Sequence, residues 1–327
     1  MRVGKNPNKR APALPAYGLH RLILPVHIPN QEGYFAQSLD ILKLCLESVR
    51  LTKAPGTAVT LIANGCDNQT LELLITEHSG GWIDQLVIHA QNRGKIDAIV
   101  GAARSCFEEV VTFSDSDVLF RPGWDTAIET LFRTFPECGF VSPFPNPDEE
   151  LRFTSSVFVS SVHHVSLEHI EDHSSLDRYN ASVGRAPTSA DVRGCLVIRR
   201  DGATACVGGG HFVCSVRRRV LRSGPFGPSL EAISSDSDRD WLDAPPDRLG
   251  YWRLATHRAY VQHMGNRPEA WMRDEVSMLT TAAKPTPATP SPLPPLRAHW
   301  TALLPYAVRA RVGLRFGRFV RHRLRPR

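Results

Sequence analysis

The sequence predicts an α/β fold in which a mostly parallel β-sheet is covered by helices. Two observations support this prediction: short apolar runs alternate with segments of helical periodicity, and the connections between them are short. Such alternation favours parallel strands, because each helix returns the chain to the same end of the sheet. Ligands bind such sheets outside the carboxyl ends of the strands. We therefore expect a ligand site at that edge.

Four strand and helix pairs are predicted in the first part of the chain. The strands are expected at residues 22–26, 59–63, 85–89 and 110–113, each followed by a helix, at 37–49, 71–75, 95–104 and 124–135. The pattern loosens beyond Phe144. There, short strands are expected at 157–162 and 195–198, and a helix at 216–221.

Composition divides the chain into four segments. They are a flexible lead-in at 1–20, one globular domain at 21–282 with halves 21–144 and 145–282, a Pro-rich linker at 283–296 and a basic amphipathic tail at 297–327. The 327 residues are long enough to bury a large core. A single large domain followed by a tethered tail is the expected organisation.

The composition is ordinary for a globular protein, with 42% hydrophobic and 22% charged residues. No apolar run approaches the roughly 18 residues of a membrane span, and the polar, basic start lacks the apolar core of a signal peptide. The seven cysteines are odd in number and contain no C-x-x-C pair, which favours reduced thiols over disulfides or a zinc site. We expect a cytoplasmic protein.

The basic charge is concentrated in the tail. Nine arginines and no acid lie beyond Leu296, so the net charge of +6 leaves −3 for the rest of the chain. On a helix, one face carries Val308, Val312, Phe316, Phe319, Val320 and Leu324, and the other carries Arg311, Arg315, Arg318, Arg321 and Arg325. This pattern is typical of a helix on an anionic membrane surface; a solvated tail is the alternative. Nucleic-acid binding is not expected, since no base-stacking platform or known motif accompanies the arginines.

Two carboxylates follow the fourth predicted strand. Asp115 and Asp117 are spaced i, i+2, so in an extended chain both point to the same face. Mg²⁺ and Mn²⁺ bind through such carboxylates together with substrate phosphates. Two surface acids in a turn are the alternative interpretation. The sequence thus predicts a metal site for a nucleotide diphosphate.

Five motifs in a fixed order resemble the GT-A-fold glycosyltransferases. They are Pro25 at the end of the first strand, Asn64-Gly-Cys-Asp67 after the second, Asn92-Arg-Gly-Lys95 before the third helix, Ser114-Asp-Ser-Asp117 with Pro122-Gly-Trp124, and a late acidic cluster followed by His263. The resemblance covers roughly residues 21–267 and is to the large family-2-type inverting transferases, which include bacterial polysaccharide and cell-wall sugar transferases.

This resemblance implies a GT-A (Rossmann-like) catalytic domain with a nucleotide-sugar half (21–144) and an acceptor half (145–282). It implies metal-dependent inverting transfer of a hexosyl group from a nucleotide-diphosphate donor to a glycan or lipid-linked acceptor, in polysaccharide or cell-envelope synthesis. The implied donor contacts are Pro25, Asn64, Asn92, Gly94, Lys95 and Asp115, and the implied ligands of Mn²⁺ or Mg²⁺ are Asp115, Asp117 and His263.

The resemblance also implies a general base in the acidic cluster at 235–241. Asp238 fits the family pattern best, Asp236 is the next choice and Asp240 is a further candidate, because the usual glutamate is missing. An N-cap with first-turn acids is the structural alternative. The acid that commonly recognises the nucleobase is replaced by Ala63-Asn64, so the donor nucleotide stays open.

Two other function classes stay open. A nucleotidyltransferase of the same fold would make a nucleotide sugar, although the expected glycine-rich phosphate loop is absent from residues 24–30. A non-catalytic binding module of the same fold is the third possibility. For a transferase with a basic tail, we expect a cytoplasmic enzyme attached peripherally to the inner face of the membrane through residues 297–327.

Overall fold

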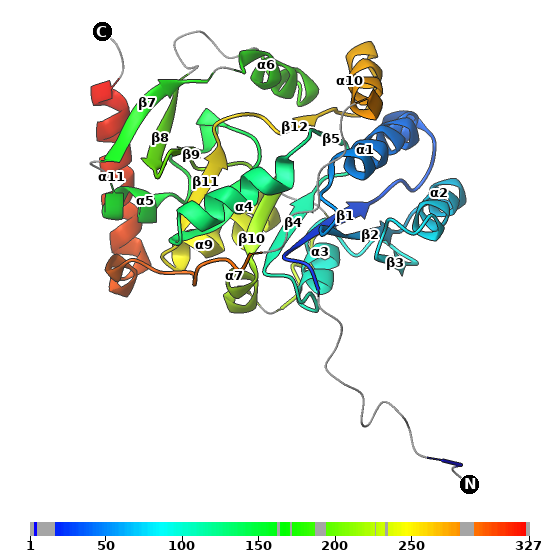
Figure 1. The fold of residues 1–327 in the computed structure, drawn as a ribbon, viewed down its shortest axis with the longest axis horizontal. Coiled ribbons are helices and arrows are strands. Elements are labelled where there is room, and N and C mark those ends of the chain that lie inside the picture. The colour runs from blue at the N-terminus through cyan, green and yellow to red at the C-terminus, as the bar shows by residue number, and fades with distance from the viewer. Residues whose placement is uncertain are drawn as a thin grey trace.

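One large sheet runs through the molecule and carries helices on both faces (Figure 1). The structure is a computed structural model that describes residues 3–4, 17–161, 164–170, 172–186, 194–225, 227–232, 235–281 and 291–324. In the described residues the sheet has ten strands, in the order β3-β2-β1-β4-β10-β6-β11-β9-β8-β7. The predicted α/β class is confirmed.

The bounds of the elements are as follows. The sheet contains β1 (His20–Val26), β2 (Ala58–Asn64), β3 (Gln85–His89), β4 (Val110–Ser114), β6 (Cys138–Ser142), β7 (Val165–His169), β8 (Gly194–Arg200), β9 (Ala203–Val207), β10 (Val213–Arg217) and β11 (Trp252–Thr256). A separate pair is formed by β5 (Val118–Phe120) and β12 (Val261–His263). The helices are α1 (Ser38–Thr52), α2 (Asn68–Ser79), α3 (Lys95–Ala103), α4 (Trp124–Thr134), α5 (Ser155–Ser161), α6 (His173–Ser182), α7 (Arg218–Ser223), α8 (Ser235–Asp238), α9 (Ala244–Arg248), α10 (Ala270–Thr281) and α11 (Tyr306–Leu324).

The sheet has a parallel half and a mixed half. β3, β2, β1 and β4 are all parallel. β10 runs antiparallel between β4 and β6, and β6 and β11 are again parallel. β9, β8 and β7 complete the sheet in antiparallel pairs. The carboxyl ends of the four parallel strands therefore meet at one edge, where the sequence predicted the ligand site.

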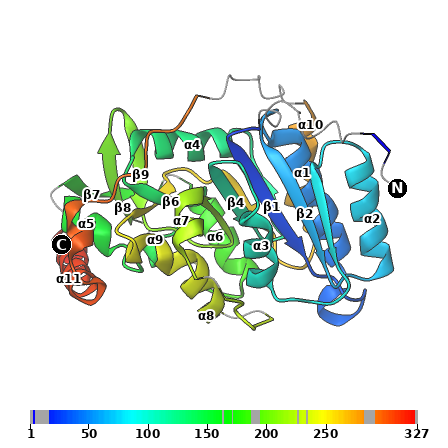
Figure 2. The same cartoon turned by 90° about the horizontal axis from the view of Figure 1, so that it is seen from below.

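Alternating side chains of the strands form a core on each face of the sheet. In β1, Leu22 and Leu24 belong to one fully buried cluster and Ile23 to the other, as expected for successive residues of a strand. The second cluster includes side chains of α3 and α7, which lie on the same side of the sheet in Figure 2. Both faces of the parallel half are thus covered, which explains its nearly continuous apolar strands.

One predicted strand is wrong. Residues 157–162 were expected to be extended, but α5 occupies Ser155–Ser161. The carboxylate of Asp247 accepts hydrogen bonds from the backbone N–H groups of Ser155 (3.3 Å) and Ser156 (2.8 Å) at the start of this helix. A short apolar run fits a buried helix as well as a strand. The contact that decides comes from a residue far away in the sequence, so local periodicity could not detect it.

The predicted lead-in and linker are also partly ordered. His20 is buried in β1, and the ring of Tyr17 stacks on that of Phe107, so residues 17–20 belong to the fold. In the linker, residues 283–290 lie outside the described residues. Beyond them, Leu293 and Leu296 are both buried. Residues 291–296 thus pack along the domain, which corrects the expectation of an extended tether through to 296.

The tail helix packs against the rest of the fold. The buried guanidinium of Arg309 donates to the backbone carbonyls of Asp247 (2.6 Å) and Arg248 (2.9 Å). A Cβ on Gly313 would lie 2.6 Å from Cα of Ser155, so only glycine allows this approach to α5. Figure 1 shows α11 lying beside α5 at the edge of the molecule.

The far end of α11 is held by a second buried arginine. Arg321 forms an ion pair with Glu150 (3.1 Å) and donates to the carbonyl of Gly194 (2.8 Å). A buried guanidinium is stable only when it is paired or hydrogen-bonded, so these contacts indicate one specific docking position. The prediction of a tail tethered apart from the domain is therefore corrected. Of the described helices, none combines the length and apolarity needed to span a bilayer.

Candidate active site

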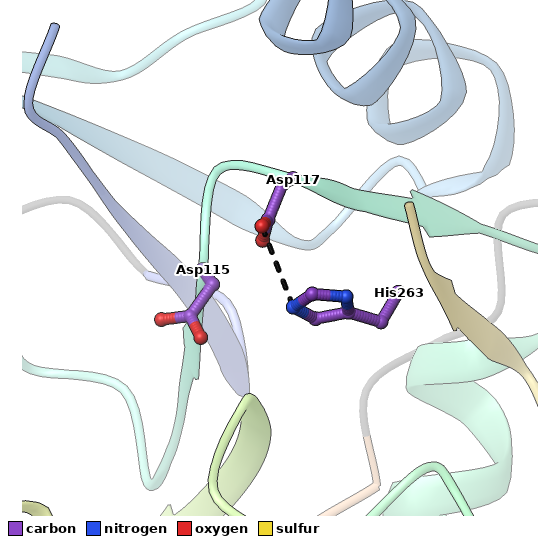
Figure 3. A group of neighbouring side chains, drawn as sticks. All are labelled: Asp115, Asp117 and His263. Atoms are coloured by element: carbon purple, nitrogen blue, oxygen red, sulfur yellow. Dashed lines mark ion pairs between the residues drawn. The ribbon is translucent and has the colours of Figure 1, made fainter. Parts of the chain in front are cut away.

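Asp115, Asp117 and His263 come together at the carboxyl edge of the parallel strands (Figure 3). Asp115 directly follows β4 and Asp117 directly precedes β5. β12 pairs with β5 so that His263 lies opposite Val118, beside Asp117. One potential ligand atom from each of the three side chains lies within 4.8 Å of the others. The topology thus unites residues that are almost 150 positions apart.

Backbone and side-chain hydrogen bonds hold these three residues in place. The N–H of Asp115 donates to the carbonyl of Phe212 (2.8 Å), and the carbonyl of Asp117 accepts from the N–H of Met264 (2.8 Å). His263 directs Nε2 toward a carboxylate oxygen of Asp117 (3.4 Å), while its Nδ1 lies 2.8 Å from the hydroxyl of Ser182. Metal-binding histidines commonly have their second ring nitrogen fixed in this way.

The chemistry of this group fits a divalent cation. Two carboxylates and one imidazole are ligands that Mn²⁺ accepts, and carboxylates suit Mg²⁺. In the part of the chain that the structure describes, the buried Oδ1 of Asp117 has no hydrogen-bond partner. Burial raises the pKa of the Asp117 carboxyl; His263 opposes that shift and the Asp115 carboxylate adds to it. A cation at this position would compensate the buried negative charge.

A pocket of about 700 Å³ surrounds the three residues. This volume lies within the range of about 300–1,000 Å³ that is typical of small-molecule sites. The pocket extends from Asp115, Asp117 and His263 past Lys95 to side chains at the ends of β1 and β2. Its lining includes Pro25, His27, Tyr34, Phe35, Asn64 and Asn92. It is thus long enough to hold a metal-bound diphosphate and further groups attached to it.

The two asparagines of the predicted donor contacts bind each other. Nδ2 of Asn64 donates to Oδ1 of Asn92 (2.9 Å), and Oδ1 of Asn64 accepts from the N–H of Arg93 (3.0 Å). Gly94 has a φ of +83°, a conformation that glycine adopts without strain, and starts α3 directly before Lys95. The Asn64 side chain therefore orders the loop, while Asn92 and Lys95 also line the pocket.

Lys95 connects the metal-binding group with the late acidic cluster. Its Nζ lies 2.6 Å from Oδ1 of Asp115 and 3.6 Å from Oδ1 of Asp238. Burial alone would lower the pKa of Lys95, but the two carboxylates raise it overall. Lys95 is therefore a fixed positive charge beside both the predicted metal ligands and the predicted base.

Asp238 lies at the end of a chain of polar contacts. Its Oδ2 is 3.5 Å from Nε2 of His211, whose Nδ1 is 2.9 Å from Asp243. Asp243 in turn accepts from the fully buried guanidinium of Arg253 (2.8 Å). Burial raises the pKa of the Asp238 carboxyl, although Lys95 and His211 oppose the shift. A carboxylate with a raised pKa in a recess is the usual state of a general base.

The other two acids of the cluster lie in different surroundings. The side chain of Asp236 is 67% exposed and that of Asp240 is 43% exposed, against 8% for Asp238. Arg239 forms ion pairs with both, and Arg248 forms a further pair with Asp240 at 3.2 Å. The geometry therefore brings only Asp238 of these three next to Lys95 and the predicted metal site.

Comparison with known families identifies the fold and the enzyme class. Residues 34–179 match the family described as "Glycosyl transferase family 2". The chain contains a family 2 glycosyltransferase region. The prediction of a GT-A glycosyltransferase of this type is confirmed. The matched region contains Asp115 and Asp117, whereas His211, Asp238 and His263 lie beyond it.

Several solved structures are similar to this chain. A mannosyltransferase, PcManGT, from Pyrobaculum calidifontis in complex with GDP-Man and Mn²⁺ is 16% identical, with a TM-score of 0.45 over 92% of this chain and 74% of that one. S. aureus TarS 1-349 is 12% identical, with a TM-score of 0.44 over 81% of this chain and 66% of that one. GalNAc-T7 with UDP, GalNAc and Mn²⁺ is 14% identical, with a TM-score of 0.45 over 75% of this chain and 44% of that one. A search of curated proteins found no match.

Sequence reasoning missed part of the candidate site. His211 and Asp243 flank the Asp238 region, and His27 lines the pocket that contains Asp115 and Asp117. His211 follows a run of three glycines, a signal of close backbone packing that could have drawn attention to it. His27 and Asp243 have no local signal, because only the tertiary fold gives them their neighbours.

Proposed function

We propose that this glycosyltransferase transfers a sugar from a nucleotide-diphosphate donor to an acceptor hydroxyl with inversion, and that it depends on Mn²⁺ or Mg²⁺. One observation supports the proposal above all: a single ammonium group, that of Lys95, separates Asp115 from Asp238. Inverting transfer needs a base on the side of the sugar opposite the leaving diphosphate. In this proposal Asp238 takes the place of the base, and the group of Asp115, Asp117 and His263 lies at the leaving diphosphate.

In this proposal the donor half of the site neutralises the negative charge of the diphosphate. Asp115, Asp117 and His263 would hold the divalent ion, which when bound neutralises the negative charge of the diphosphate as it leaves. Lys95 supplies a second positive charge at the same end of the pocket. Pro25 and Gly94 keep the backbone close to the donor, since Pro25 lines the pocket and Gly94 positions Lys95 at the start of α3.

Asp238 is proposed as the base that removes the proton of the acceptor hydroxyl. Its carboxylate is buried, and its oxygens face Lys95 and His211. His211 is held by Asp243, and this network fixes the direction of the Asp238 side chain. Asp236 and Asp240 are assigned to surface ion pairs with Arg239.

One edge of the proposed donor pocket carries two polar side chains that bind each other. Nδ1 of His27 lies 2.8 Å from the carbonyl of Asn64, and because a carbonyl only accepts, this nitrogen carries the proton. Nε2 of His27 then accepts from Nδ2 of Asn92 (3.3 Å), and this contact uses its lone pair. The contact selects no particular nucleobase, so we propose a nucleoside diphosphate sugar as donor, with its base to be identified by titration.

A calorimetric titration tests this proposal. In the presence of Mn²⁺, at least one of UDP, dTDP, GDP, ADP and CDP is expected to bind, because the ion neutralises the diphosphate beside Asp115 and Asp117. Chelation of the metal should weaken binding of that nucleotide strongly. His27→Ala should also weaken it, because His27 lines the pocket, while His78→Ala, at an exposed position of α2, should not.

The two alternative functions predict different results for the same purified protein. A nucleotidyltransferase would bind a nucleoside triphosphate and release pyrophosphate from it. A non-catalytic module would bind the nucleotide sugar but release no nucleoside diphosphate with any acceptor. Binding of all five nucleotides with equal affinity, with or without metal, would contradict the proposed donor site.

A membrane surface is proposed as a second partner, on the evidence of the outer side of α11. This side exposes Val308, Val312, Phe316 and Phe319, next to the exposed arginines Arg311, Arg315 and Arg318, and Trp300, Leu303 and Leu304 are exposed just before the helix begins. Such a combination fits the interface of an anionic bilayer. In contrast to the sequence-based expectation, the helix is docked on the domain, so the whole enzyme would lie on the cytoplasmic face of the membrane. A lipid-linked acceptor in polysaccharide or cell-envelope synthesis is consistent with this placement.

Vesicle sedimentation tests the membrane proposal. The protein is expected to bind vesicles rich in anionic lipid and to bind less at high salt. The double substitution of Phe316 and Phe319 with Glu should weaken binding at least about tenfold, since each buried Phe contributes about 1.5–3 kcal/mol. Glu at the exposed Ile75 and Ile88, far from α11, is the matched control. Failure of the unmodified protein to bind at low salt would exclude this partner.

A further inference from the structure

A second pocket lies on the other side of Asp238. Its volume is about 500 Å³, large enough for a small organic ligand. His211 and Asp243 line its inner end. Because the two carboxylate oxygens of Asp238 face Lys95 and His211, this side chain lies between the second pocket and the donor pocket. A hydroxyl bound at this end of the second pocket would lie beside His211, which contacts Asp238.

Helix α11 forms one wall of this second pocket. Tyr306, Ala310 and Leu314 all line it, and their i, i+4, i+8 spacing puts them in one row along the helix. The facing wall includes Leu151 and Phe153. The charged residues Arg152, Asp236, Arg239, Asp243 and Asp247 also line it, together with Thr154 and Ser155. The pocket therefore combines an apolar strip with charged groups near the base.

The wall opposite α11 is tied to the catalytic network. Arg253, which pairs with Asp243, also donates to the carbonyl of Arg152 (2.7 Å), and its guanidinium lies 5.9 Å from the ring of Phe153. Phe153 has a φ of +49°, which is rare for a bulky residue. Such backbone strain persists where the surroundings enforce it and is concentrated at functional sites. The shape of the pocket is thus fixed by the side chains that hold His211.

We propose that this second pocket binds the acceptor and that α11 selects acceptors with an apolar group next to the hydroxyl that receives the sugar. This inference rests on the proposed transferase function and extends it to the substrate class. A free sugar would leave Tyr306, Ala310 and Leu314 in contact with water, whereas an alkyl or aryl glycoside would cover them. Helix α11 lies outside the region matched by the family, so this selectivity is a property of the individual chain.

Two pairs of variants test the role of α11. Ala310→Trp fills the pocket from its wall, and Ala307→Trp makes the same change on the exposed side of the helix. Leu314→Gln changes the polarity of the wall without adding bulk, with Ile75→Gln at an exposed position of α2 as its control. Transfer is measured as nucleoside diphosphate release, with p-nitrophenyl and octyl glycosides of common hexoses and with the corresponding free hexoses as acceptors.

The unmodified protein is expected to use at least one aryl or alkyl glycoside better than its free sugar. Ala310→Trp should lower kcat/KM for that glycoside by about tenfold or more, and Leu314→Gln should reduce its advantage over the free sugar, both within the range for changes in an apolar specificity pocket. The two control variants should behave like the unmodified protein. Nucleotide affinity with Mn²⁺ should stay the same in all four variants, which shows that they are folded.

Three results would overturn the inference. They are equal use of glycosides and free sugars, no use of any glycoside by a protein that binds nucleotide, and an Ala310→Trp variant with unchanged transfer. Loss of nucleotide binding in the unmodified protein would instead contradict the proposed function itself. The two failures are therefore distinguishable. An octyl glycoside used better than the aryl one would point to a lipid-like acceptor, and the reverse to an aromatic one, with α11 as the selecting wall in both cases.

Discussion

Asp117→Asn is expected to reduce transfer by about 10³-fold or more. Its carboxylate lies between Asp115 and His263, and it is the member of the group with a buried oxygen that no other described residue satisfies. Loss of metal-supported charge stabilisation costs several kcal/mol of transition-state energy, and each 1.36 kcal/mol is about a factor of ten in rate. The measurement is nucleoside diphosphate release at saturating donor, with Mn²⁺ varied.

Asp40→Asn is the matched control for this prediction. Asp40 is an exposed acid on α1 that forms a 3.4 Å surface pair with Lys43 and does not line the pocket. It should leave both activity and Mn²⁺ dependence unchanged. Full transfer by Asp117→Asn at ordinary metal concentration would mean that Asp117 is no metal ligand.

Asp238→Asn is expected to preserve donor affinity but to lower kcat by about 10²–10⁴-fold, the range for loss of a general base. The amide keeps the size of the side chain and its place beside Lys95, so nucleotide binding should hardly change. Asp236→Asn and Asp240→Asn are the matched controls, because both acids belong to exposed ion pairs with Arg239. If Asp236→Asn abolished transfer while Asp238→Asn remained active, the base would be Asp236 instead of Asp238.

The pH dependence of kcat/KM is a second test of the role of Asp238. A base must be deprotonated to act, so kcat/KM should fall as the pH decreases through the pKa of Asp238. Burial raises that pKa above the usual aspartate range, despite the opposing charges of Lys95 and His211. The acid limb of the profile should therefore lie at higher pH than for an exposed aspartate, and the residual activity of Asp238→Asn should lack this limb. An unshifted limb in that variant would assign it to a different group.

The first half of the fold was accessible from the sequence because its signals are local. The predicted strand at 85–89 coincides with β3, and the helix predicted at 95–104 differs from α3 by one residue at its end. Apolar periodicity and glycine turns are properties of neighbouring residues. The same locality explains why Asp115 and Asp117 could be recognised at the end of β4.

The second half was less accessible because distant contacts decide it. The helical state of α5 depends on Asp247, and the position of α11 depends on Arg309, Gly313 and Arg321. On a helical wheel, Gly313 weakens an amphipathic helix, whereas in the structure it makes the close contact with α5. The arginines that the sequence assigned together to the face opposite the apolar residues are divided, with Arg321 buried and Arg311 exposed.

The candidate site also contains residues with local sequence signals and residues that only distant contacts bring into place. The three side chains of the predicted metal site do come together in the structure, since Asp115, Asp117 and His263 meet within 4.8 Å. The order of choice among the three acids also agrees with their exposure, which is lowest for Asp238. His211 and its partner Asp243 could not be assigned, because a histidine after glycines has many structural uses. Their relation to Asp238 exists only in the folded chain.

Anomalous diffraction from crystals grown with Mn²⁺ and the nucleoside diphosphate that binds best tests the central proposal most directly. The proposal predicts one strong manganese peak in contact with Asp115 or Asp117 and with the diphosphate, within reach of Nε2 of His263. Asp238 should then lie on the side of the donor site opposite the diphosphate. A bound nucleotide without manganese between these residues, or with manganese at a different place, would contradict the account.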